Sequence, residues 1–276
     1  MRNLKIGLLM VAAQVVAFSS VVHAQQVNEE GQEIVISKED KYKVKPSFEA
    51  PEGQLFFESN LSTLPLSGYE NVIVINKAQA KFDAKGRVID SPAQKLRIYR
   101  NGQLYKLTQN GELIDSTKVS TGRENVEIVS GFKKLIKKIF GGKGTSESHW
   151  RHTTNGFYTM KRLEGPLYKS GESGFTMPYA MFFNSTNGLA IHAVPPDLSS
   201  KAGGEAGGEA NLGQRSSSGC VRVHKNVVQE IRSLVDAAGR GQVPSVDPKT
   251  GNVNKKPDGS DLMIDGYRTI VIVEEF

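Results

Sequence analysis

The chain has 276 residues, a length that suits one large domain or two modest ones. Its hydrophobic content of 38% supports a core, and 28 glycines beside one tryptophan indicate a strand-rich body with many turns. The formal net charge of +6 is mildly basic and does not by itself argue for nucleic-acid binding, and the single cysteine excludes an intramolecular disulfide.

Residues 1–24 have the pattern of a secretory signal peptide. Arg2 and Lys5 give a positive start, residues 6–18 are almost wholly apolar, and residues 22–24 end in a small residue suited to cleavage. The apolar run is short for a membrane span, which leaves an uncleaved anchor as the alternative. Cleavage removes two cations and lowers the formal charge from +6 to +4. An exported protein of this charge suits an anionic surface such as a cell wall or lipid headgroups.

Three further regions follow the signal peptide. Residues 25–66 are polar apart from short apolar runs at 34–36 and 55–57. We interpret them as an N-terminal extension that partly packs on the main domain, with a disordered spacer as the alternative. Residues 67–276 form the main domain, and an insert at about 126–150 interrupts it.

The main domain has the patterning of a sheet protein. Residues 95–100 alternate between polar and apolar, which suits a half-buried strand, and the following Asn101-Gly102 is a strong hairpin signal. Asn110-Gly111 repeats that signal. We expect strands over 72–75, 95–100, 104–107, 118–122, 156–160, 189–192 and 267–273. The predicted fold is mostly β and antiparallel, with one or two helices.

Two segments have a helical period instead. Residues 132–140, within the insert, carry apolar side chains on one face and four lysines on the other. This short helix either packs on the sheet with a solvated lysine face or makes a peripheral contact with an anionic wall or membrane. Apolar positions between 227 and 238 predict a second helix, with Asn226 as its cap and Gly239 as its stop. The glycine-rich residues 199–212 are expected to form a flexible loop.

The only cysteine, Cys220, lies in a run of small and polar residues rather than in an apolar strand. A thiolate attacks carbonyls well, so a reactive Cys220 needs a base to take its proton. His192 is the best candidate because it ends an apolar strand just before two prolines. The alternatives are a buried, unreactive cysteine and a hydrogen-bonded core histidine.

Other residues compete with this pair or complete it. His224 is a rival base close after the cysteine, while His149 and His152 could pair on a metal, although no His-Glu-x-x-His motif is present. Gly219 allows close approach, and the backbone N–H groups of residues 219–220 could stabilise an oxyanion. Arg222 could bind a carboxylate, favour the thiolate, or form an ordinary salt bridge.

Ser217-Ser218-Gly219-Cys220-Val221-Arg222 resembles the catalytic signature of the L,D-transpeptidase family, Ser/Thr-x-Gly-Cys-Ile/Val-Arg. Ile191-His192 resembles the family's Ile-His-Gly, and Val119-Ser120-Thr121-Gly122 resembles its Val-Ser-Thr-Gly strand. Met177-Pro178-Tyr179 resembles the stretch before the histidine. Three departures are the alanine at 193, the long gap from His192 to Cys220, and the insert near 126–150.

The resemblance implies a sandwich-like or barrel-like β fold and a periplasmic enzyme that acts on peptidoglycan stem peptides, donor and acceptor. Cys220 would be the nucleophile and His192 the base, and no metal or organic cofactor is expected. Ser217, Ser218, Gly219 and Arg222 would shape the site, and Tyr179 would line the donor groove.

The acceptor is left open by the resemblance. The thioester on Cys220 would pass to an amine on another stem and make a 3→3 cross-link, or to a lipoprotein lysine, a free D-amino acid or water. A hydrolase, either a carboxypeptidase or an amidase that releases wall-linked lipoprotein, is therefore an alternative. A catalytically silent wall-binding domain is another.

Overall fold

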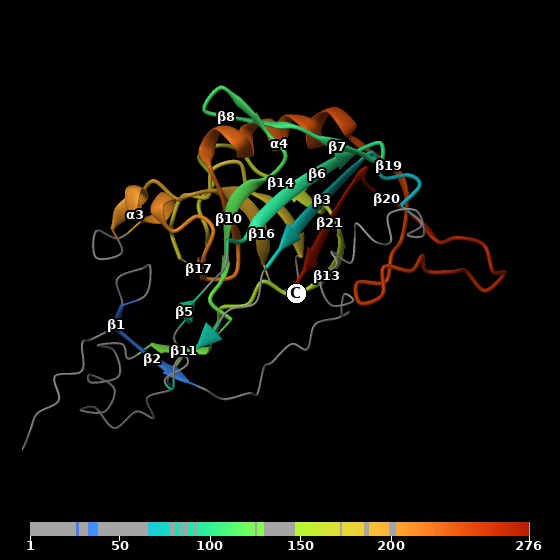
Figure 1. The fold of residues 1–276 in the computed structure, drawn as a ribbon. Coiled ribbons are helices and arrows are strands. Elements are labelled where there is room, and N and C mark those ends of the chain that lie inside the picture. The colour runs from blue at the N-terminus through green and yellow to red at the C-terminus, as the bar shows by residue number, and fades with distance from the viewer. Residues whose placement is uncertain are drawn as a thin grey trace, which may run out of the picture.

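The structure is a computed structural model, shown in Figure 1. It describes residues 26–27, 33–37, 66–77, 81–82, 84, 88–90, 93–124, 126–129, 147–171, 173–184, 188–198 and 203–275. The predicted signal peptide at 1–24 and the predicted helix at 132–140 lie outside these residues, as does most of the extension at 25–66.

The body of the molecule is an eleven-stranded sheet. Along its main path the strand order is β13 (Gly156–Thr159), β21 (Thr269–Glu274), β3 (Asn71–Asn76), β6 (Lys95–Arg100), β10 (Thr117–Gly122), β18 (Val221–Val223), β16 (Leu189–Ala193), β15 (Met181–Asn184) and β14 (Arg162–Leu163). Two more strands pair off this path, namely β7 (Gln103–Tyr105) with β6 and β17 (Arg215–Ser217) with β10. The predicted mostly-β fold is confirmed.

Most pairs in the sheet are antiparallel, but β3 with β21, β10 with β17 and β16 with β18 are parallel. The first of these pairs lies inside the sheet, between β13 and β6, and consists of β-branched runs. Alternate residues of β3 enter different core clusters, with Ile73 and Ile75 on one face and Val72 and Val74 on the other. A strand that is buried on both faces needs such a continuous apolar run.

The helix α4 (Lys225–Ala238) covers one face of the sheet, as Figure 1 shows. It buries an apolar stripe that consists of Val227, Val228, Ile231, Leu234, Val235 and Ala238. The prediction of this helix was right, and Gly239 ends it with a φ of 66°. The predicted cap was wrong, because the helix begins one residue before Asn226 and its N-cap position is His224, without a side-chain cap.

The other face of the sheet is covered by the hairpin of β19 (Arg240–Pro244) and β20 (Met263–Tyr267) together with the chain between them. A helix, α3 (Gly204–Ala210), occupies part of the segment that was expected to be a flexible loop. Its Gly208 lies so close to Val194 that an added Cβ atom would be 2.5 Å from that side chain. Close packing therefore explains glycine at this helical position.

Both predicted Asn-Gly turns form hairpins. Asn101 and Gly102 join β6 to β7, and Asn110 and Gly111 join β8 (Leu107–Gln109) to β9 (Glu112–Ile114). All four residues have positive φ, which the type I′ turn requires and which Asn-Gly tolerates.

A separate four-stranded sheet joins the N-terminal extension to the insert. Its order is β1 (Gln26–Val27), β2 (Glu33–Ser37), β11 (Val126–Val129) and β12 (Glu147–Trp150). The insert thus begins and ends as a strand, and β2 pairs with the first of these strands. A short two-stranded ladder, β4 (Lys81–Phe82) with β5 (Val88–Asp90), completes the described strands.

Candidate active site

The parallel pair of β16 and β18 brings the predicted nucleophile and base to the same part of the sheet. In its register His192 is the partner of Arg222 and Ile191 is the partner of Val221. Ile191 and Val221 point into the core beneath α4. Because side chains alternate along a strand, His192 and Arg222 point to the opposite face. Cys220 directly precedes β18 and packs against an apolar cluster that contains Ala190, so it lies on the face of His192.

His192 is buried, and its surroundings define its protonation state. Its Nδ1 lies 2.6 Å from the carbonyl oxygen of Ala193. A carbonyl can only accept, so Nδ1 carries the proton and Nε2 is left as the basic nitrogen. Burial disfavours the imidazolium and lowers the pKa of His192 to about 4, although the hydrogen bond to Ala193 acts in the opposite direction. The imidazole is therefore neutral at pH 7 and able to take a proton.

The loop that carries Cys220 is held by its own serine. Ser217 Oγ accepts the N–H of Gly219 at 3.1 Å and donates to the carbonyl oxygen of Cys220 at 2.5 Å. Gly219 has a φ of 127°, where glycine is strongly favoured. The half-buried thiol of Cys220 lies 3.7 Å from the carbonyl oxygen of Gly188.

The three remaining predicted residues occupy different environments. Ser218 is half-buried between Ser217 and Gly219. Arg222 is buried, and burial lowers its pKa to about 10, which leaves it cationic at neutral pH. Tyr179 accepts a hydrogen bond from Gln229 of α4 at 2.8 Å and packs against the core on the helix side. The hydrogen bond described for the Tyr179 hydroxyl is thus with α4, not with the cysteine loop.

The rival histidines have other positions. His224 precedes the first turn of α4. His152 directs Nδ1 to Glu124 Oε2 at 2.7 Å, and the side chain of His149 lies outside what the structure describes. Among the described residues, no group of three or more His, Cys, Asp or Glu could hold a metal ion.

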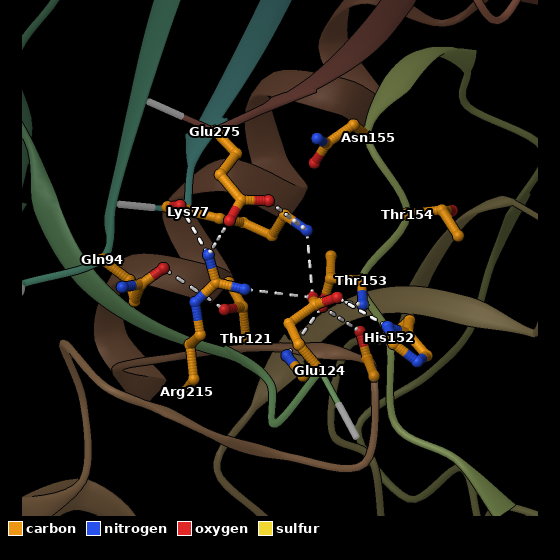
Figure 2. Close-up of polar contacts among 12 residues, drawn as sticks. Lys77, Gln94, Thr121, Glu124, His152, Thr153, Thr154, Asn155, Arg215 and Glu275 are labelled. Atoms are coloured by element: carbon orange, nitrogen blue, oxygen red, sulfur yellow. Dashed lines mark hydrogen bonds and ion pairs between the residues drawn. The ribbon is translucent and has the colours of Figure 1, made fainter. Parts of the chain in front are cut away.

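One group of charged residues beneath the cysteine loop was not predicted. Glu124 contacts Lys77 at 3.0 Å, Arg215 at 3.4 Å and His152 at 2.7 Å, as Figure 2 shows. Burial alone would raise the pKa of this carboxyl, but the two cations and the hydrogen bond from His152 outweigh it and lower the pKa to about 2. The only signal in the sequence is that Glu124 closely follows the Val-Ser-Thr-Gly motif.

Comparison with known families identifies the class of this protein. Residues 85–271 match the family model YkuD, the L,D-transpeptidase catalytic domain. The chain belongs to this family and is an L,D-transpeptidase, which implies peptidoglycan peptides as its substrates. The family acts on the cell wall, which is consistent with an extracytoplasmic location.

The comparisons with individual proteins add less. The chain is similar to the crystal structure of the L,D-transpeptidase (residues 123–326) from Xylanimonas cellulosilytica DSM 15894. The two are 14% identical, with a TM-score of 0.36, over 80% of this chain and 70% of that one. The curated proteins contain no match. None of the helices that the structure describes is long and apolar enough to cross a membrane.

Proposed function

We propose that the protein is a periplasmic L,D-transpeptidase that cross-links peptidoglycan stems through a thioester on Cys220. The observation that carries the proposal is the neutral His192, whose Nδ1 is committed to the Ala193 carbonyl and whose strand neighbours the one that Cys220 precedes. The predicted signal peptide at 1–24 supports export.

The first half-reaction acylates the enzyme. His192 Nε2 takes the thiol proton as the sulfur attacks the carbonyl of the third residue of a tetrapeptide stem. A C–S bond forms, the C–N bond to the terminal D-alanine breaks, and the proton passes to the amine that leaves. A histidine with a pKa of about 4 is a weak base, but it is unprotonated throughout the neutral range and so always available.

The second half-reaction restores the thiol. An amine on another stem attacks the thioester, the C–S bond breaks, and His192 takes the amine proton before it returns a proton to sulfur. A 3→3 cross-link results. A lipoprotein lysine or a free D-amino acid would react in the same way, and water would give a hydrolase.

The remaining site residues support this chemistry. Ser217 holds the loop by its two backbone contacts, and Gly219 permits its conformation. We assign the oxyanion contact to the N–H of Cys220, the amide of the nucleophile itself. Arg222 places a buried positive charge on the same face, and Ser218 and Tyr179 remain predicted contacts to substrate.

The test is incubation of the protein with purified tetrapeptide muropeptides, followed by mass spectrometry. Release of D-alanine together with a 3→3 dimer is expected, and Cys220→Ala should abolish both. D-alanine release without a dimer, in the presence of an amine acceptor, would identify a carboxypeptidase. Activity that survives in Cys220→Ala would refute the proposal, and a protein in which a carbapenem does not acylate Cys220 would be a silent wall-binding domain.

A further inference from the structure

The hydroxyl of Thr153 connects the end of β10 to the cysteine loop. Thr153 is fully buried, and its Oγ1 accepts the N–H of Gly122 at 2.8 Å. The same oxygen donates to the carbonyl oxygen of Gly219 at 2.6 Å. A hydroxyl that accepts from one backbone group and donates to another is fixed in direction, and each bond strengthens the other.

This contact fixes the peptide plane next to the nucleophile. The carbonyl of Gly219 and the N–H of Cys220 belong to one planar peptide group, in which a trans bond points them in opposite directions. A hydrogen bond that holds the Gly219 carbonyl therefore also sets the direction of the Cys220 N–H. With a φ of 127°, Gly219 has no side chain to prevent this peptide from turning.

Thr153 is itself held by the charged group around Glu124. The Thr153 N–H donates to Glu124 Oε1 at 3.2 Å, and the neighbouring His152 binds the other carboxylate oxygen. Figure 2 shows Glu124 between Arg215 and His152, with Lys77 above. Because Glu124 remains ionised well below neutral pH, this support does not depend on pH in the working range.

Close backbone packing completes the support. A Cβ atom on Gly122 would lie 2.3 Å from the carbonyl oxygen of Arg151, so β10 and the segment at 151–153 touch directly. In addition, the Glu124 N–H donates to that same carbonyl at 2.8 Å. Backbone contacts of the segment at 151–153 and the hydrogen bond from Gly122 thus fix the position of the Thr153 hydroxyl before any substrate binds.

We infer that Thr153, held by Glu124, is a positioning residue that aims the Cys220 N–H at the oxyanion of the acyl-transfer step. The inference rests on the proposed function, in which Cys220 becomes acylated. It predicts that two reactions of the Cys220 sulfur respond differently to loss of the Thr153 hydroxyl. Loss of the hydroxyl should slow reactions that form an oxyanion and leave alkylation of the same sulfur unchanged, because alkylation forms no oxyanion.

The experiment compares Thr153→Val, Thr153→Ser and the matched control Thr154→Val in the full chain. The hydroxyl of Thr154 contacts Tyr158 and Asn184, not the cysteine loop. Each variant is treated with p-nitrophenyl acetate, which acylates the thiol with loss of p-nitrophenolate, and with iodoacetamide, which alkylates it. For Thr153→Val we expect acylation to fall roughly 10- to 100-fold, somewhat less than the loss of a whole oxyanion donor. Alkylation should be unchanged, and Thr153→Ser and Thr154→Val should both acylate normally.

Several results would overturn the inference. Equal losses of acylation and alkylation in Thr153→Val would show a merely structural role, and normal acylation would show no role. A Thr153→Ser variant that fails like Thr153→Val would show that the methyl group matters instead of the hydroxyl. Acylation by the ester but no reaction with muropeptides would refute the proposed function while leaving this comparison intact. A native protein that is alkylated but never acylated would refute both.

Discussion

His192 and Arg222 are register partners in the parallel pair of β16 and β18, and both point away from the core beneath α4. Cys220 lies two residues before Arg222, and its side chain lies on the same face of the sheet as His192. Nucleophile, base and a buried cation are thus positioned by one ladder of backbone hydrogen bonds. Because that ladder belongs to the main sheet, we expect substitutions of these side chains to change the chemistry more than the fold.

Replacement of His192 by Asn should separate acid–base chemistry from packing. Asn can still donate to the Ala193 carbonyl but cannot take the thiol proton, so acylation of Cys220 should slow by roughly 10²- to 10⁴-fold. Carbapenem acylation followed by mass spectrometry measures this rate. The rate should recover at high pH, where the thiolate forms without a base. An unchanged rate at pH 7 would exclude His192 as the base.

The acid limb of the pH–rate profile should lie unusually low. A histidine with an ordinary pKa of 6.5 would lose activity below pH 6.5, whereas the pKa of His192 is lowered to about 4 by burial. The free imidazole therefore persists down to about pH 4, and acylation should not decline through protonation of His192 between pH 6.5 and 5. The pH dependence of kcat/KM for D-alanine release measures this. A midpoint near 6.5 would contradict the buried environment that we describe.

Glu124→Gln should destabilise the protein and change its response to acid. The variant removes one of the two carboxylates that pair with the buried Lys77 and Arg215, while Glu275 stays in contact with both cations. We therefore expect a loss of about 1–3 kcal/mol in the free energy of unfolding, the usual cost of a charge-assisted hydrogen bond lost in a buried site. The pKa of Glu124 is about 2 when folded and about 4.5 when unfolded, so the unfolded state binds more protons between these values. The stability due to this carboxylate is thus present above pH 4.5 and lost as the pH falls towards 2.

Urea unfolding at several pH values between 2 and 7 tests this expectation. The native protein should lose stability as the pH falls from 4.5 towards 2, and Glu124→Gln should lack the part of that slope that one carboxylate contributes. Parallel curves for the two proteins would show that Glu124 is not the titrating group. Asp236→Asn, which removes an exposed carboxylate from the surface of α4, serves as the control.

Gly122→Ala should separate β10 from the segment that holds the cysteine loop. The added Cβ would lie 2.3 Å from the Arg151 carbonyl oxygen and 2.8 Å from the Thr153 nitrogen, both of them backbone atoms. We expect a loss of about 1–3 kcal/mol in stability, measured by urea unfolding, and slower acylation of Cys220. Gly165→Ala is the matched control because no atom lies within 4 Å of its Cβ position. Equal stability of the two variants would contradict the close contact.

Local patterns were sufficient to predict much of the fold. Both Asn-Gly hairpins and the apolar stripe of α4 depend on neighbouring residues, so the sequence displays them directly. The prediction that His192 serves as the base for Cys220 came from motif chemistry and not from periodicity. It was consistent with the strand ending at His192, but nothing in the sequence indicated that β16 and β18 run parallel.

Other features depend on contacts between distant residues, and these were missed. The glycine-rich composition of α3 suggests a flexible loop, yet position 208 requires glycine because Val194 packs against it. The contacts of Glu124 come from Lys77, His152 and Arg215, which are far apart in the chain and carry no shared pattern. The pairing of the extension with the insert is equally non-local.

The parallel direction of β16 and β18 has a consequence for how this enzyme tolerates change. Two parallel neighbours cannot be joined by a tight turn, so the chain must cross from the end of one to the start of the other. The length of that crossover, which here includes α3 and β17, is uncoupled from the spacing of imidazole and thiol. We therefore expect a change of length before β17, where the crossover has not yet reached Arg215 and Ser217, to leave the relative placement of the two groups unchanged.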